Sequence, residues 1–276
     1  MKKNPLVDEK EFICGWAAAA TNIILTYPIQ KISALQVINH ENITLASKHI
    51  VNGWHIRWIY RGILPPLCQK SLSISCMFGF YNNLFNYLTR KNVKHARFLS
   101  GLASGTMEST IMPFERMQSI LINKKFNKKY KNMLDVMINL NREYGFKEYY
   151  RGFSLIFFRN VLGNICFFTL KHESDYYISE SLESPFFQNV FRFIHGGIIG
   201  AFLSTIFYPL TVLKLELQKE VGTKHFSPLK AFKDVYSNEK KLRHFYRGGF
   251  MNGARSFLSW GIINSSYEIY SKLLFE

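Results

Sequence analysis

The chain has 276 residues, 47% of them hydrophobic and 16% aromatic, and it carries a formal net charge of +16. This composition argues against an ordinary cytosolic globule and leaves a membrane or a nucleic acid as the natural partner. A nucleic-acid-binding protein is disfavoured because the charge lies mainly in loops between apolar segments, without a zinc pattern or a recognition motif. A mean hydropathy of −0.05 fits amphipathic helices that face lipid on one side and a wet cavity on the other.

Sequence motifs for catalysis or metal binding are missing. The histidines form no H-E-x-x-H pattern, and neither a Gly-rich phosphate loop nor a local nucleophile signature occurs. The cysteines lack the spacing of metal ligands. We therefore expect no enzyme, no metal site and no cofactor.

One pattern recurs three times along the chain. A proline near the end of an apolar run is followed, about 34 to 39 residues later, by the glycine of an aromatic-Arg-Gly triplet. The prolines are Pro28, Pro113 and Pro209, and the triplets end in Arg61-Gly62, Arg151-Gly152 and Arg247-Gly248. Recurrence at a nearly fixed period is typical of a repeat architecture. We expect one domain over residues 1–276, made of repeats at 12–92, 95–180 and 188–276.

Each repeat opens with an apolar segment long enough to span a membrane. These segments cover residues 12–37, 98–122 and 190–218. Each has its proline toward the C-terminal side, where we expect it to kink the helix rather than end it. Each also carries small residues four positions apart, such as Gly101 and Gly105, and such pairs let two helix backbones approach closely in lipid.

A short amphipathic pattern and a second apolar segment complete each repeat. The amphipathic patterns lie at 45–54, 133–144 and 229–238 and predict helices along the membrane surface. The second spans cover residues 63–88, 153–178 and 249–274. The sequence thus predicts an all-α membrane protein with six transmembrane helices in three pseudo-threefold repeats and both termini on one side.

The arrangement resembles the mitochondrial carrier family over nearly the whole chain. Members of that family carry Pro-x-acid-x-x-base in each odd-numbered helix, and the three copies here begin at Pro28, Pro113 and Pro209. No copy is intact. In the family the acid of one copy pairs with the base of the next and closes a gate on the matrix side. The resemblance implies the pairs Gln30 with Gln118, Glu115 with Lys214, and Thr211 with Ser33.

These three pairs leave one ionic contact, two neutral contacts and no stranded charge. We interpret them as a softened but working gate, because an unpaired buried charge would be costly. The resemblance further implies a multi-pass protein of the mitochondrial inner membrane that acts as a monomer, with the amphipathic helices on the matrix side.

Charges that break the threefold repeat indicate where an asymmetric solute binds. Seven residues before the acid position, Glu108 has only uncharged counterparts in the other two repeats. Near the seventh residue after each triplet glycine lie Gln69, Lys70, Arg159, Asn160 and Arg255. Ionisable groups at mid-membrane depth are costly unless water or a partner meets them. The surplus of cations predicts an anionic, phosphate-bearing solute, although one cation would equally serve to neutralise Glu108.

The triplets offer a second kind of anion site. An arginine beside the exposed amides of a helix N-terminus favours a lipid phosphate. We therefore expect the Arg-Gly pairs at 61–62, 151–152 and 247–248 to bind anionic membrane lipid, including cardiolipin. As capping turns alone the triplets would also make sense.

Several stretches, among them residues 60–66 and 259–264, are most similar to the members of the family that carry NAD⁺. The resemblance implies import of NAD⁺ into the matrix by alternating access through a central site. Lys70, Arg159 and Arg255 would hold the pyrophosphate, and Glu108 would face the positively charged nicotinamide ring. The open alternatives are another phosphate-bearing nucleotide or coenzyme A as the solute, and a non-transporting membrane scaffold built on the carrier fold.

Overall fold

The computed structural model describes residues 9–51, 56–181, 185–223, 227–239 and 242–275. Helices make up nearly all of these residues, and no strand occurs among them. The result agrees with the all-α class that the apolar periodicity predicts.

In the first repeat, α1 (Glu9–Ile38) and α4 (Leu64–Arg90) are the two long helices, joined through α2 (Ile43–Val51) and α3 (Ile56–Ile59). Helix α2 begins two residues before the amphipathic pattern expected at 45–54 and overlaps it, and residues 52–54 of that pattern lie outside the described part. The sequence pattern did not indicate the single turn of α3. Helix α1 continues through Pro28 without a break.

The second repeat contains α5 (Ala96–Thr110), α6 (Met112–Ile122), η1 (Lys124–Phe126), α7 (Met133–Tyr144), η2 (Phe146–Tyr150) and α8 (Phe153–Ser181). The third contains α9 (Pro185–Ile206), α10 (Tyr208–Gln218), α11 (Pro228–Glu239), η3 (Leu242–Tyr246) and α12 (Gly249–Phe275). Helices α7 and α11 match the amphipathic patterns expected at 133–144 and 229–238.

The prolines of the second and third repeats stand where a helix is interrupted. A single residue, Ile111 or Phe207, separates the two helical segments, and the proline occupies the first turn of the new one. Helices α9 and α10 meet at an angle of 51°. The expected kink therefore takes the form of a break at Pro113 and Pro209, because proline lacks the amide hydrogen that would continue the helix but fits its first turn.

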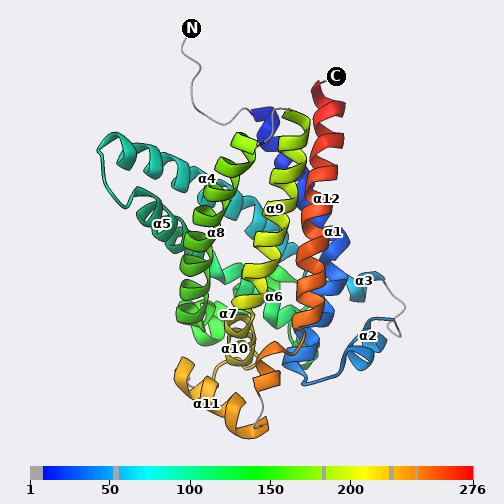
Figure 1. The fold of residues 1–276 in the computed structure, drawn as a ribbon. Helices are drawn as coiled ribbons and strands as arrows, with labels where there is room; N and C mark the ends of the chain where they lie inside the picture. The colour runs from blue at the N-terminus through cyan, green and yellow to red at the C-terminus, as the bar shows by residue number, and fades with distance from the viewer. Residues whose placement is uncertain (1–8, 52–55, 182–184, 224–226, 240–241, 276) are drawn as a thin grey trace.

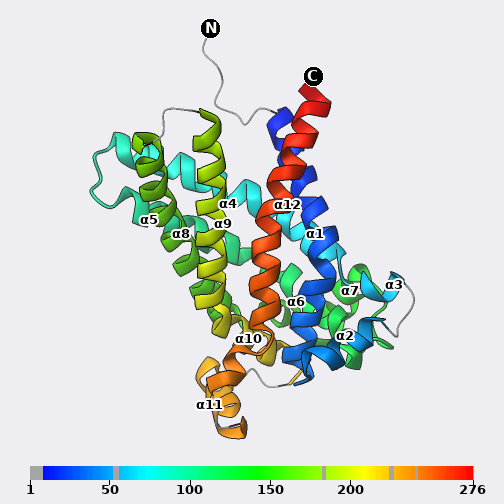
Figure 2. The same cartoon turned by 45° about the vertical axis from the view of Figure 1, so that its right-hand side comes forward.

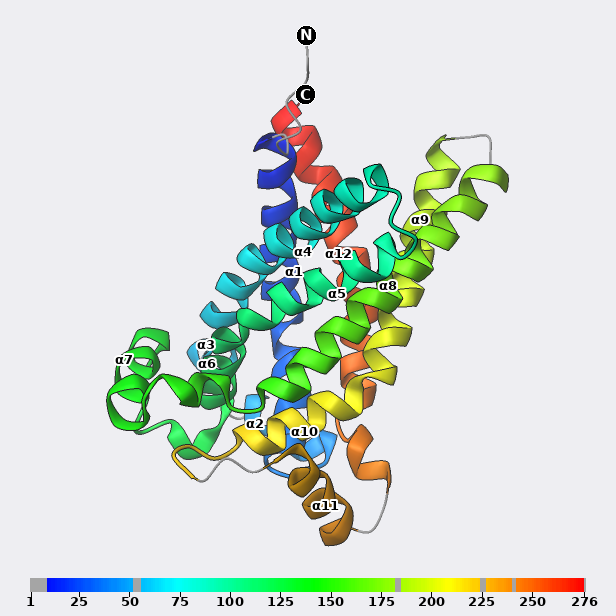
Figure 3. The same ribbon diagram turned by 90° about the vertical axis from the view of Figure 1, so that its left-hand side faces the viewer.

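The long helices form a closed ring around a central space. Neighbours in the ring are α1 with α4, α4 with α5, α5 with α8, α8 with α9, α9 with α12, and α12 with α1. The start of α1 and the end of α12 lie at the same end of the bundle, and α2, α7 and α11 lie at the other (Figures 1 and 2). At that second end, α6 and α10 pass inward and contact α1 and each other, so the bundle is closed there (Figure 3).

Two glycines set the contact between α5 and α8. A Cβ added to Gly105 would lie 2.5 Å from the Cα of Val161, and one added to Gly101 would lie 3.0 Å from the Cα of Ile165. The small-residue pairs expected from the sequence therefore act as a close helix contact in this repeat. In the first repeat the corresponding Gly15 has open space around it.

Few of the helices are uniformly apolar. Within the described residues, only Phe153–Leu170 passes a hydropathy test for a membrane span on its own, and α9 together with α10 passes as a bent pair. The apolar side chains lie outward, as at Phe202 and Phe257, which are 58% and 69% exposed. Polar side chains line the interior, and they lower the mean hydropathy of each helix.

Candidate substrate-binding cavity and gate

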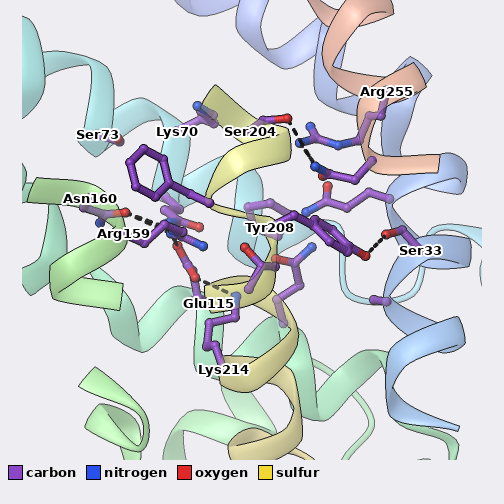
Figure 4. Close-up of a pocket in the computed structure, with 18 of the residues that line it drawn as sticks. Ser33, Lys70, Ser73, Glu115, Arg159, Asn160, Ser204, Tyr208, Lys214 and Arg255 are labelled. Atoms are coloured by element: carbon purple, nitrogen blue, oxygen red, sulfur yellow. Dashed lines mark hydrogen bonds and ion pairs between the residues drawn. The ribbon is translucent and has the colours of Figure 1, made fainter. Parts of the chain in front are cut away.

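A cavity with a volume of about 410 Å³ occupies the middle of the ring. Its wall contains all the residues that the sequence predicted for substrate binding or for the gate, in two groups. The expected substrate-binding residues in the wall are Gln69, Lys70, Glu108, Arg159, Asn160 and Arg255. The expected gate residues in the wall are Gln30, Ser33, Glu115, Gln118, Thr211 and Lys214. Side chains from all three repeats converge on this one space (Figure 4).

Glu115, on α6, is the most highly connected carboxylate of the cavity. Its Oε2 accepts a hydrogen bond from Nζ of Lys214 at 2.8 Å, and its Oε1 accepts from Nη2 of Arg159 at 2.7 Å and from Nε2 of Gln69 at 2.9 Å. The Glu115 and Lys214 side chains are 9% and 10% exposed. The donors come from α10, α8 and α4, so one carboxylate joins all three repeats (Figure 4). The contact between Glu115 and Lys214 is the one that the family pattern implied.

In each of the two neutral pairs expected in the gate, the two partners are not hydrogen-bonded to each other. Nε2 of Gln118 is buried without a partner, and no hydrogen bond joins it to Gln30 in the described part of the chain. Instead of pairing with Thr211, the Ser33 hydroxyl lies 3.1 Å from the Tyr208 hydroxyl and donates to the carbonyl of Gly248 at 3.0 Å. The short side chain of Ser33 thus reaches the backbone of the third triplet.

Tyrosines that precede the prolines hold the triplets in place. The hydroxyl of Tyr27 donates to the carbonyl of Arg61 at 2.6 Å, and that of Tyr208 donates to the carbonyl of Arg247 at 2.8 Å. At Gly248 the backbone has φ +79°, and a Cβ there would lie 2.6 Å from the Tyr208 hydroxyl oxygen. The sequence signal for these contacts is the Tyr-Pro pair shared by the first and third repeats, which the expected site residues did not include.

The second repeat has Met112 at the position before its proline and uses another donor. Nε2 of Gln218 donates to the carbonyl of Arg151 at 3.0 Å. The Arg151 guanidinium, on a side chain only 3% exposed, donates to the carbonyl of Leu217 at 2.6 Å and to the Thr223 hydroxyl at 2.6 Å. These bonds attach the second triplet to the end of α10.

The guanidinium groups of Arg61 and Arg151 therefore do not extend toward lipid as we expected. Arg61 donates to the carbonyls of Asn127 and Tyr130, and Arg151 donates to Leu217 and Thr223 of the third repeat, as given above. Arginine presents several donors in a fixed fork, and buried carbonyls at the ends of loops need such donors. In these two triplets the arginine thus fastens one repeat to the next.

A buried ion pair reinforces the seam between the second and third repeats. Nη2 of Arg116 donates to Oε1 of Glu148 at 2.5 Å, with the side chains 0% and 4% exposed. The Arg116 guanidinium also donates to the carbonyls of Gln218 and Glu220. The sequence did not suggest this group, because its partners are mostly backbone atoms.

Glu108 is held by neutral donors. Its Oε1 accepts from the Ser73 hydroxyl at 2.9 Å, and its Oε2 accepts from Nδ2 of Asn164 at 3.2 Å. Within the described residues no cation is ion-paired with Glu108. The alternative that a nearby cation merely neutralises it is therefore not the arrangement found.

Lys70 and Arg255 are the cations of the cavity wall that lack a carboxylate partner among the described residues. Arg255 makes one long hydrogen bond, from Nη2 to Oδ1 of Asn252 at 3.4 Å, and its Nε is buried without a partner. Lys70 is exposed to the space that it lines. The chamber therefore holds a carboxylate on α5 and cations on α4 and α12 whose charges no ion pair offsets.

These features have a counterpart among known proteins. A family model described as mitochondrial carrier protein matches the chain at residues 9–92, 94–181 and 187–276. The chain belongs to the mitochondrial carrier family. The three matched segments follow the three structural repeats of this carrier, each with its proline and its triplet.

Individual carriers are similar over almost the full chain. The mitochondrial nicotinamide adenine dinucleotide transporter SLC25A51 of Mus musculus is 37% identical over 97% of this chain and 90% of its own length. The human mitochondrial nicotinamide adenine dinucleotide transporter SLC25A52 is 36% identical over 96% of this chain and 90% of its own length. Human solute carrier family 25 member 53 is 29% identical, over 95% and 87% of the two chains.

Proposed function

We propose that this carrier imports NAD⁺ into the mitochondrial matrix as its transported substrate, acting as a monomer. The observation that carries the proposal is the central chamber, whose wall contains Lys70, Arg255 and Glu108, none of them in an ion pair with another described residue. The similarity to carriers named for nicotinamide adenine dinucleotide supports the same solute.

The chemistry of NAD⁺ suits that distribution of charge. Its pyrophosphate is anionic, and its oxidised nicotinamide ring is cationic. Arg255 suits the planar, bidentate recognition of phosphate oxygens, and Lys70 acts as a compact point charge. Arg159, Gln69 and Asn160 line the same space and complete the phosphate side. Glu108 faces the nicotinamide ring in this scheme, because a partly buried carboxylate without a counter-ion favours a cation.

Transport follows the alternating access of the family, with the site exposed to one side and then to the other. The contact between Glu115 and Lys214 supports a closed gate at the end where α2, α7 and α11 lie. The remaining gate residues also line the chamber, and their side chains move apart when the gate opens. They are Gln30, Ser33, Gln118 and Thr211. Pro28, Pro113 and Pro209 are the points about which the odd-numbered helices swing.

The carrier crosses the mitochondrial inner membrane six times, and the start of α1 and the end of α12 lie on the side opposite the gate (Figure 1). We propose that anionic lipid, including cardiolipin, binds at the helix starts that follow the triplets. A hollow of about 320 Å³ at the start of α8 is lined by Gly152, Phe153, Ser154 and the cation Lys147. Amide groups at a helix start together with a lysine favour a phosphate. By analogy, Gly62 and Gly248 mark the starts of α4 and α12.

Uptake of labelled NAD⁺ by purified protein in cardiolipin-containing liposomes tests the function. We expect saturable uptake that unlabelled NAD⁺ inhibits more strongly than ADP or coenzyme A does. Stronger inhibition by ADP or coenzyme A would assign the site to another phosphate-bearing solute. Absence of uptake for all three, with specific binding retained, would indicate a non-transporting scaffold.

The role of Glu108 has its own test in the same liposomes. NADH carries the same pyrophosphate but has an uncharged nicotinamide ring. We expect Glu108→Gln to weaken inhibition by NAD⁺ about tenfold, the effect of one charge-assisted contact, and to leave inhibition by NADH nearly unchanged. Equal effects on NAD⁺ and NADH would remove the nicotinamide ring from this carboxylate.

A further inference from the structure

Arg159 belongs to the gate and to the chamber at the same time. Its Nη2 donates to Oε1 of Glu115 at 2.7 Å, while its Nε and Nη2 lie 3.1 and 3.0 Å from Oδ1 of Asn160. No partner is found for Nη1 among the residues that the structure describes, and the side chain is 23% exposed. Arg159 is therefore held along one edge and reaches the chamber that it lines.

The other cations of the chamber are differently placed. Lys70 and Arg255 have no carboxylate within ion-pair distance in the described ranges. A phosphate group held by these two cations brings a second anion to the chamber in which Glu115 binds Arg159. A guanidinium fork matches a phosphate as well as a carboxylate, so the two anions compete for it.

We propose that Arg159 is a shared ligand, which passes from Glu115 to the phosphate of the bound solute and thereby loosens the gate. Glu115 then keeps Lys214 and Gln69 but loses one of its two cations. A buried carboxylate that loses a hydrogen-bonded cation is destabilised, so the closed arrangement around Glu115 becomes less stable when the chamber is loaded. Arg159 is in this sense a positioning residue for the gate as well as a ligand of the solute.

Thermodynamic linkage makes this coupling reciprocal. If a bound phosphate weakens the contact between Arg159 and Glu115, then that contact must weaken phosphate binding by the same factor. Removal of the Glu115 charge is therefore expected to increase the affinity for a phosphate, even though the residue lines the site. The inference deepens the proposed function, since it assigns the step by which the solute acts on the gate.

The test uses inorganic pyrophosphate, which has the anionic centre of NAD⁺ without the nicotinamide ring, and the full-length protein in detergent. Calorimetric titration should give about tenfold tighter binding for Glu115→Gln than for the unaltered protein, as expected for one charge-assisted hydrogen bond. The control is Glu143→Gln, which removes an exposed carboxylate that pairs with Lys129 and does not line the chamber. We expect less than about a twofold change for it, because its loss releases no cation into the chamber.

A double-mutant cycle separates competition from the general field of a carboxylate. On an Arg159→Gln background the substitution Glu115→Gln should change pyrophosphate affinity by less than about twofold. An increase that persists without Arg159, or an equal increase for Glu143→Gln, would overturn the inference.

Two further measurements keep the test decisive. If Glu115→Gln does not fold, Glu115→Asp shortens the side chain by one methylene and draws the carboxylate away from Arg159 without removing its charge. Pyrophosphate affinity should then rise about twofold to threefold, but only when Arg159 is present. The same rise without Arg159, or no rise with it, would contradict the inference. Loss of NAD⁺ uptake with an intact pyrophosphate cycle would refute the proposed function alone, and NAD⁺ uptake without the coupling would refute the shared ligand alone.

Discussion

The Nζ atom of Lys214 lies 2.8 Å from Oε2 of Glu115, although the two residues are 99 positions apart and belong to different repeats. Charge reversal of either residue, as Glu115→Lys or Lys214→Glu, places like charges together in a buried site and should abolish most NAD⁺ uptake. Both reversals together should restore part of the uptake. The recovery should be incomplete, because Arg159 would then lie beside a lysine. Uptake by the double variant no higher than by the single ones would argue against the pair as a gate.

The Tyr208 hydroxyl connects α10 with Ser33 of α1 and with the carbonyl of Arg247. Tyr208→Phe removes these contacts and should cost about 1 kcal/mol of stability. The thermal midpoint in detergent should then fall by about 2 °C or more.

A matched control for Tyr208 is Tyr246→Phe, since the Tyr246 side chain is 49% exposed. The free energy of unfolding of this variant should lie within about 0.5 kcal/mol of that of the unaltered protein. Equal shifts for the two phenylalanine variants would mean that the Tyr208 hydroxyl does not stabilise the seam.

Gly105 lies against the backbone of α8, where an added Cβ would be 2.5 Å from the Cα of Val161 and 2.8 Å from the carbonyl oxygen of Asn160. Gly105→Ala should force α5 and α8 apart and cost about 1–3 kcal/mol, which exceeds the gain in helix propensity of about 1 kcal/mol. Gly15→Ala is the control, since open space surrounds Gly15. Thermal melting checks both, and a less stable Gly15→Ala than Gly105→Ala would contradict the packing argument.

Glu148 is the acidic member of a buried group that also contains Arg116 and Arg151. Glu148→Gln leaves two buried guanidinium groups without a counter-charge and should cost about 3–5 kcal/mol, seen as a large loss of monodisperse protein on size-exclusion chromatography. Glu143→Gln removes an exposed carboxylate that pairs with Lys129 and should have almost no effect. Recovery of Glu148→Gln at the level of Glu143→Gln would show that the buried pair is dispensable.

The threefold recurrence of the pattern was enough to predict the repeats, the long helices and the short surface helices. Comparison of equivalent positions between repeats also predicted that Lys70, Glu108, Arg159 and Arg255 converge, and all four line one chamber. The prediction was possible because residues at the same helical register face the same central space. The ionic pair between Glu115 and Lys214 followed from the family pattern, since two opposite charges at complementary positions have few other ways to be satisfied.

Neutral contacts were harder to foresee. Ser33 finds Tyr208 and the carbonyl of Gly248 rather than Thr211, and Arg151 finds the carbonyl of Leu217. Backbone carbonyls are present at every position, so their use leaves no mark in the sequence. The second bond of Arg159 was missed for a related reason: its position predicted the chamber, but the carboxylate that it contacts lies 44 positions away on another helix.

The fastening by Arg116 has a mechanical consequence. It ties α6 to the end of α10 through the carbonyls of Gln218 and Glu220, whereas at the same end of the bundle Ser33 joins α1 to the third repeat through neutral hydrogen bonds. The second and third repeats should then move together as one rigid unit, and the first repeat should move relative to them. Spin labels on α7 and α11 should keep their separation during turnover, while a label on α2 moves relative to one on α11. Equal changes in both distances would show that the three repeats move apart to the same extent.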